Sequence, residues 1–115
     1  MARNEDEAFF NTFYDSLKPG GILGVVEHRA PDSASRQEMI DNGYVSEAFV
    51  KDATARAGFE FVASSEVNAN LKDTKDYAEG VWTLPPSYRL GDTDRAKYTA
   101  IGESDRMTLK FRKPL

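Results

Sequence analysis

The sequence contains no cysteine and a single histidine, His28, among its 115 residues. The lack of cysteine excludes disulfides, thiolate metal sites and cysteine nucleophiles, and the single histidine excludes any site that needs two imidazoles. No apolar run reaches the roughly 18 residues that a membrane-spanning helix needs. The start Asn4-Glu5-Asp6-Glu7 is acidic, whereas the start of a signal peptide is basic. We therefore expect a soluble chain, which is cytoplasmic by default.

The chain also lacks an excess of positive charge, since 15 Lys and Arg stand against 19 Asp and Glu, a net charge of −4. We therefore expect neither a nucleic-acid partner nor a membrane partner. Lys110, Arg112 and Lys113 alternate with apolar residues, which is typical of the solvated face of a strand. With 40% hydrophobic and 30% charged residues, residues 1–115 have the composition of one globular domain.

Two main helices are predicted from apolar residues at helical spacing. The first covers residues 4–17, carries an aromatic stripe, and begins with a capping box between its first residue and Glu7. It ends at residues 18–21, Lys-Pro-Gly-Gly, because proline cannot continue a helix. The second follows Ser46 as its N-cap and ends at Gly58, a residue suited to the left-handed conformation there.

Three strands are predicted. Residues 22–26 are apolar at every position, a pattern typical of a strand buried between helix layers in a parallel sheet. Residues 59–64 and 106–112 alternate with a period of two, and the latter strand should be covered mainly on one face. We interpret the polar residues 30–43 as a long loop, and residues 67–103 as an irregular insert with short helical turns.

Four segments carry a family resemblance. They are the turn Leu17-Lys18-Pro19-Gly20-Gly21, and the segments Val25-Val26-Glu27-His28-Arg29-Ala30, Asp73-Thr74-Lys75, and Ser104-Asp105-Arg106 through Lys110-Phe111-Arg112-Lys113-Pro114. In these segments and in the order of its elements, the chain resembles the C-terminal half of class I S-adenosylmethionine-dependent methyltransferases. More narrowly, it is similar to a group of bacterial proteins predicted to be methyltransferases. The resemblance covers nearly the whole chain.

The resemblance implies an α/β fold built on a partial Rossmann-like methyltransferase sheet of about three strands, with two main helices and a long irregular insert. The strands would be the family's fifth, sixth and seventh, with the seventh antiparallel between the other two, in the local order 5-7-6.

In the family, a Gly-rich turn after the first strand and an acidic residue at the end of the second hold S-adenosylmethionine. Neither is found here, because Gly20, Gly21 and Gly24 precede a strand instead of following one. The first predicted helix also begins almost at Met1, which fits a chain without the first half of such a domain. We expect a truncated methyltransferase-like domain that binds no cofactor and has no independent catalytic activity.

Glu27, His28 and Arg29 end the first predicted strand, where ligands of open α/β sheets bind, and are therefore substrate-side candidates of a complete domain. His28 could act as a general base, because imidazole titrates near neutral pH, or it could join Glu27 in satisfying loop backbone groups. Arg29 could bind an acidic substrate or pair with Asp32 or Glu27.

Trp82 and Tyr88, with Tyr98, are further substrate-side candidates in the insert. These aromatic side chains could form a lid over an apolar methyl acceptor, or they could anchor the insert to the core. The aspartates of the insert match no calcium-loop pattern, so no metal site is expected.

The strand at residues 22–26 should have a neighbour in a complete domain, and without it presents an unpaired apolar edge. We expect a homodimer, formed by pairing of these edges or by packing of helix faces across a two-fold axis. The alternative is a complete, small, non-enzymatic homo-oligomeric binding or scaffold module. A small hydrolase is disfavoured, because no serine lies in a recognisable nucleophile turn.

Overall fold

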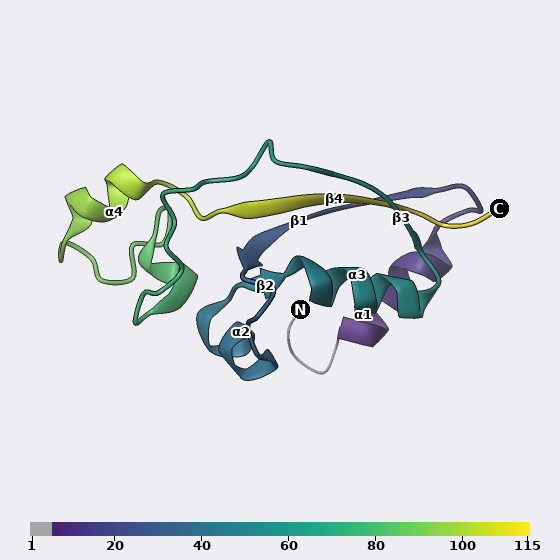
Figure 1. Ribbon diagram of the computed structural model, residues 1–115, viewed down its shortest axis with the longest axis horizontal. Coiled ribbons are helices and arrows are strands. Elements are labelled where there is room, and N and C mark those ends of the chain that lie inside the picture. The colour runs from purple at the N-terminus through teal and green to yellow at the C-terminus, as the bar shows by residue number, and fades with distance from the viewer. Residues whose placement is uncertain (1–5) are drawn as a thin grey trace.

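The computed structural model describes residues 6–115, which form an elongated α/β fold of 51 × 27 × 24 Å with a four-stranded mixed sheet. In chain order the elements are α1 (Asp6–Ser16), β1 (Ile22–Ala30), α2 (Arg36–Asn42), β2 (Val45–Ser46), α3 (Glu47–Ala57), β3 (Glu60–Ser65), the 3-10 helix η1 (Gly80–Thr83), α4 (Arg95–Ile101) and β4 (Arg106–Arg112). Helices α1 and α3 lie on the same side of the sheet, and the insert that carries α4 lies beyond one end of it (Figure 1).

The sheet has the strand order β2-β1-β4-β3. Strand β4 is antiparallel to β1 from the pair Ile22↔Arg112 to the pair His28↔Arg106, and it is also antiparallel to β3. The last strand therefore lies between the other two long strands, in the predicted local order. The two-residue strand β2, which pairs in parallel with the end of β1, was not predicted. The Rossmann-like character of the sheet stays a prediction.

Helix α3 has the two caps that the sequence predicts. The Ser46 hydroxyl accepts a hydrogen bond from the backbone N–H of Phe49 (3.1 Å), and Gly58 ends the helix with a φ of 108°. Helix α1 extends to Ser16. Asn4, and with it the predicted capping box to Glu7, lies outside the described residues.

The core lies between the sheet and the two longer helices. Alternate residues of β1 and β4 face the helices because side chains of a strand alternate between the two faces. The buried apolar side chains of this layer include Phe10, Val25, Val50, Met107, Leu109 and Phe111. Full burial of such a side chain stabilises the fold by roughly 1.5–3 kcal/mol, so these residues fix the helices against the sheet.

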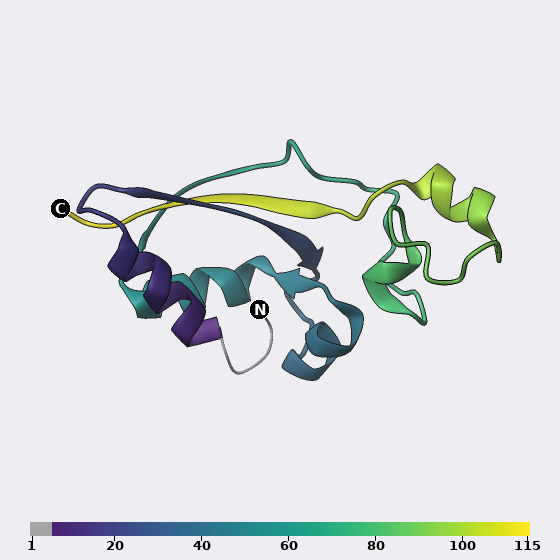
Figure 2. The ribbon, with the colours of Figure 1, turned by 180° about the vertical axis from the view of Figure 1, so that it is seen from behind.

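The opposite face of the sheet is bare, as the two views in Figures 1 and 2 show. Ile22 and Val26 of β1 are 49% and 52% exposed there. The prediction that residues 22–26 are buried on both faces is therefore wrong. Residues 22–28 of β1 also have no strand partner on the side away from β4 within the described chain. We call the uncovered face of the sheet the bare face. It carries Ile22 and Val26 of β1 and Thr108 and Lys110 of β4.

The predicted long loop at residues 30–43 is also wrong. Strand β1 continues to Ala30, and helix α2 follows it with Ser35 as its N-cap, whose hydroxyl accepts from the backbone N–H of Glu38 (3.1 Å). Gly43 ends α2 with a φ of 76°, the left-handed conformation that glycine adopts without strain.

The insert between β3 and β4 is irregular with short helical turns, η1 and α4, as predicted. Its two ends meet, because the Asn70 side-chain amide donates hydrogen bonds to the backbone carbonyls of Ile101 (2.7 Å) and Glu103 (2.8 Å). None of the described helices is long and apolar enough to cross a membrane.

Candidate functional site

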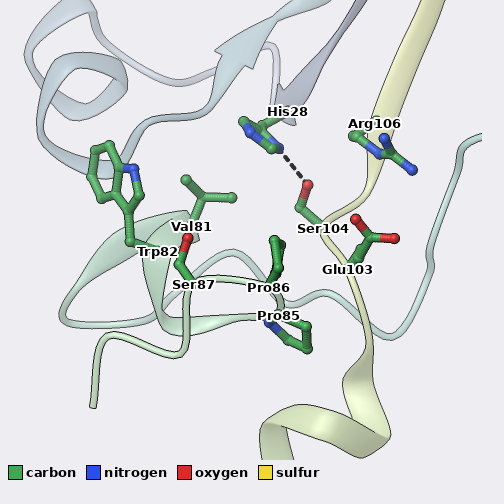
Figure 3. A pocket seen from close by; sticks show the side chains of 9 residues that line it. All are labelled: His28, Val81, Trp82, Pro85, Pro86, Ser87, Glu103, Ser104 and Arg106. Atoms are coloured by element: carbon green, nitrogen blue, oxygen red, sulfur yellow. Dashed lines mark hydrogen bonds between the residues drawn. The ribbon is translucent and has the colours of Figure 1, made fainter. Parts of the chain in front are cut away.

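A pocket of about 280 Å³ lies where the end of β1 meets the insert and the start of β4 (Figure 3). Its lining combines a polar side and an apolar side. The polar side is formed by His28, Ser87, Glu103, Ser104 and Arg106, and the apolar side by Val81, Trp82, Pro85 and Pro86. Proline rings and the indole ring supply a rigid wall. Of the polar residues, His28 lies on β1 and Arg106 on β4, and the others lie in the insert or just before β4.

The register of the sheet brings the polar groups together. His28 of β1 is paired with Arg106, the first residue of β4, and Ser104 precedes that strand by two residues. A hydrogen bond of 2.5 Å joins His28 Nδ1 and Ser104 Oγ, and the two side chains face each other in Figure 3. Ser104 is buried, and the ring of Tyr44 lies edge-on to the imidazole at 6.5 Å. These contacts fix the imidazole, and His28 Nε2 has no hydrogen-bond partner among residues 6–115.

Arg106 is the unpaired cation of the pocket. Its Nε is buried without a hydrogen-bond partner, and the guanidinium makes no ion pair within the described chain. Its backbone N–H donates to the carbonyl of Asn68 (3.0 Å), which holds the residue at the mouth of the insert. The side chain therefore has donor capacity that the described residues do not use.

Arg29, the neighbour of His28, is instead fully engaged by carboxylates. Its guanidinium donates to both carboxylate oxygens of Asp105 (2.8 and 2.9 Å), to Glu66 (2.7 Å) and to Glu47 (3.1 Å). The hydrogen bonds that Arg29 donates to Asp105 and Glu66 raise its pKa above the ordinary value. Structural pairing thus accounts for Arg29, but the predicted partners Asp32 and Glu27 are wrong.

Asp105 is the buried centre of this ion cluster. Lys75 Nζ lies 2.8 Å from its carboxylate, and the backbone N–H of Asn70 donates to it at 2.8 Å. Burial by itself raises the pKa of Asp105, but the hydrogen bonds from Arg29, Lys75 and Asn70 lower it more. The net pKa lies well below the ordinary value of an aspartate, so Asp105 is ionised at neutral pH.

Glu27 lies apart from the pocket. Its carboxylate accepts a hydrogen bond from the backbone N–H of His28 (3.0 Å), and it borders a shallow hollow between β1 and the aromatic residues of α1. Because neighbouring residues of a strand point to opposite faces, Glu27 and His28 cannot both face the pocket. The observed bond matches the alternative in which Glu27 satisfies a backbone group.

The three aromatic candidates of the insert are separated. Trp82 lines the pocket, and the Arg89 guanidinium lies over its ring at 5.1 Å. Tyr88 lies outside the pocket, where its hydroxyl bonds to Thr99 Oγ1 (2.9 Å) and its ring contacts the Arg95 guanidinium (3.8 Å). Tyr98 is also outside the pocket, buried with its ring edge-on to that of Tyr77 at 5.9 Å. Of the six substrate-side candidates, the structure thus brings together His28 and Trp82.

Ser104, Arg106 and the cis Pro85-Pro86 pair are pocket residues that the sequence analysis did not select. A signal existed for Ser104 and Arg106, since the segment Ser104-Asp105-Arg106 leads into the last strand and was already part of the family resemblance. Asp73, an aspartate of the insert, accepts from the Tyr44 hydroxyl and from the Asp105 backbone N–H. Among residues 6–115 no three His, Asp or Glu side chains are placed to hold a metal ion.

The pocket therefore offers one guanidinium, the free Nε2 of one fixed imidazole and an apolar wall to a small molecule. Comparisons of the sequence with protein-family models and with curated proteins gave no match.

Proposed function

We propose that this chain is the C-terminal part of an S-adenosylmethionine-dependent methyltransferase-like domain and that it has no independent catalytic activity. The observation that carries the proposal is the bare face together with the free edge of β1. Doubly wound sheets are covered by helices on both faces, whereas α1 and α3 cover only one face here. A further helix layer and a strand beside β1 are the parts that would complete such a domain.

The glycines near β1 support the proposal that this chain binds no S-adenosylmethionine by itself. Gly20 has a φ of 84° and donates its N–H to the Lys113 carbonyl (2.8 Å), and Gly21 donates to the Lys18 carbonyl (2.8 Å). These hydrogen bonds form the tight connection between α1 and β1. The glycines are thus used before a strand, whereas a turn that approaches a cofactor follows one.

Titration calorimetry with S-adenosylmethionine tests this part of the proposal. We expect no binding heat from the isolated chain at ligand concentrations up to hundreds of micromolar. Saturable binding at micromolar concentration would contradict it. Binding of S-adenosylhomocysteine would contradict it equally. Both ligands contain adenosine, whose ribose is held in the family by the acidic residue that this chain lacks.

We further propose that a second copy covers the free edge of β1 and the bare face in a homodimer. A hollow of about 370 Å³ on this face is bordered by Ile22, Gly24 and Ala63, and exposed apolar strand edges favour association. The two copies would be related by a two-fold axis, so that each edge pairs with its equivalent.

Light scattering at tens of micromolar tests the dimer, since the monomer mass is 12.8 kDa. We expect twice that mass for the wild type and the monomer mass for Val26→Lys, which places a charge on the bare face. Leu71→Lys is the control, because Leu71 is 98% exposed in the insert. A wild type that stays monomeric, or a Val26→Lys variant that still dimerises, would contradict this part of the proposal.

The second candidate is a small, non-enzymatic homo-oligomeric binding or scaffold module, which the preformed pocket at His28 favours. The source DNA distinguishes the two. A cofactor-binding reading frame directly upstream would support the methyltransferase fragment, and a start codon with its own promoter before Met1 would support the module.

A further inference from the structure

We propose that the pocket at His28 binds a small organic carboxylate, with Arg106 as the partner of the anion and Trp82 and Pro86 against its apolar part. The inference goes beyond the proposed function, because it depends on this pocket alone. It requires neither a cofactor nor a residue of a second copy.

The charges around the pocket favour an anion. The other cations near the pocket have carboxylate partners. Arg29 and Lys75 are each 2.8 Å from a carboxylate oxygen of Asp105, and Arg89 is 3.7 Å from Glu79. Arg106 has no such partner among the described residues, and its buried Nε makes no hydrogen bond. A buried donor without an acceptor destabilises a protein. A carboxylate accepts two parallel bonds from one guanidinium, so a carboxylate in the pocket can pair with Arg106 through its two terminal nitrogens, which make no ion pair with the described residues.

A second polar group is held ready beside Arg106. Because the Ser104 hydroxyl occupies His28 Nδ1, the imidazole is fixed in orientation and only Nε2 is left for a ligand. Ser104 is itself 4% exposed, so solvent does not compete for this bond. His28 and Arg106 are cross-strand partners, which places both side chains on the same face of the sheet.

The shape of the pocket indicates the size of the ligand. A volume of about 280 Å³ lies at the lower limit of small-molecule sites. Trp82 and the cis Pro85-Pro86 pair line it with flat rings, and the Arg89 guanidinium over the indole restrains Trp82. A single-ring acid fits these dimensions and presents a flat apolar body to the wall.

One carboxylate of the protein opposes the anion. Glu103 lines the same pocket and is exposed, so its charge is screened by solvent but still repels a bound carboxylate. This gives a signature that a purely structural role of the pocket would not produce. Removal of the Arg106 charge weakens binding, and removal of the Glu103 charge strengthens it.

Benzoate is the probe, and benzamide is the neutral molecule of matched shape. The chain has one tryptophan, so the indole N–H of Trp82 gives a single signal from the pocket in a ¹H–¹⁵N NMR titration of the full chain. We expect saturable shifts with benzoate and a Kd on the order of a millimolar, as suits a ligand of this size. Benzamide should bind about tenfold more weakly or less.

Three variants complete the test. Arg106→Gln should weaken benzoate binding about tenfold or more, as expected for a lost charge-assisted pair. Arg112→Gln, on the same strand but paired with Glu60 away from the pocket, should leave the Kd unchanged, and Glu103→Gln should lower it. If Arg106→Gln does not fold, two measurements that leave Arg106 in place still test the proposal. They are the comparison of benzoate with benzamide and the Kd of the Glu103→Gln variant. Equal binding of benzamide, no saturation by benzoate, or weaker binding by Glu103→Gln would overturn the proposal.

Discussion

Substitution of Asp105 by asparagine tests the ion cluster that joins β1 to the insert. The Asp105 side chain is 5% exposed and accepts from Arg29 Nε and Nη2, from the Asn70 N–H and from Lys75. Removal of one member of a buried ion pair costs about 3–5 kcal/mol, because the other member keeps a buried charge. Arg29 retains Glu47 and Glu66, so we expect the lower limit, about 3 kcal/mol.

Urea unfolding followed by circular dichroism measures this loss at pH 7, and thermal unfolding should show a midpoint lower by roughly 10 °C for a domain of this size. The effect also depends on pH. The folded pKa of Asp105 is lowered below its ordinary value of 3.8, so its contribution is complete above that value and is lost as the pH falls further. The difference between wild type and Asp105→Asn should therefore narrow below about pH 4.

Asp52→Asn is the matched control, because Asp52 forms an exposed pair with Arg56 (3.1 Å). Exposed pairs contribute little, so this variant should stay within about 0.5 kcal/mol of the wild type. The reasoning would be refuted if Asp105→Asn lost less than about 1 kcal/mol at pH 7. It would also be refuted if the difference were as large at pH 3 as at pH 7.

Two further substitutions test the packing around the site. Gly80→Ala should lower the unfolding free energy by more than about 2 kcal/mol, because its Cβ would lie 2.5 Å from the Asn42 carbonyl oxygen. Gly91→Ala is the comparison, because Gly91 has a similar φ of 63° but open space around it, and its unfolding free energy should fall by only about 1 kcal/mol. Equal losses of unfolding free energy in the two variants, measured by chemical denaturation, would contradict this. Tyr44→Phe removes the buried hydroxyl bond to Asp73 (3.1 Å) and should cost about 1.5–3 kcal/mol at pH 7. Burial and the Asp73 charge raise the pKa of Tyr44 above 10.0. The unfolding free energy of the wild type should therefore fall as the pH rises above 10, because the unfolded state loses the tyrosine proton first. Tyr44→Phe should lack this loss when unfolding is measured over a series of alkaline pH values.

The elements that the sequence predicted correctly have strong local signals. Helix α3 has Ser46 before it and Gly58 after it, and β4 alternates cleanly between apolar and polar residues. Helix α2 was missed because its seven residues carry only Met39 and Ile40 as apolar residues, too few to show a helical period. The end of β1 was missed because its residues are polar and are stabilised by Asp105, which lies 76 positions from Arg29.

The pocket was only partly predictable for the same reason. His28 could be selected because it ends an apolar strand, and Trp82 because aromatic residues are conspicuous in an irregular segment. Ser104 and Arg106 become pocket residues only through the register of β4 against β1. That register depends on long-range packing, which no local pattern in the sequence reports.

Hydrogen bonds tie the two ends of the insert together, so changes within the insert need not disturb the sheet. The Asn70 amide bonds to the carbonyls of Ile101 and Glu103, and the Asn68 carbonyl accepts from the N–H of Arg106, so the segment leaves and re-enters the sheet at one place. The entropy of closing a loop grows only slowly with its length. Exposed parts of the insert, such as the turn at Gly91, can therefore change in length or sequence while β3 and β4 keep their register. Asp73, Lys75 and Gly80 are constrained by their contacts with residues outside the insert. Ligand preference could thus diversify in the insert while the strands that present His28 and Arg106 stay the same.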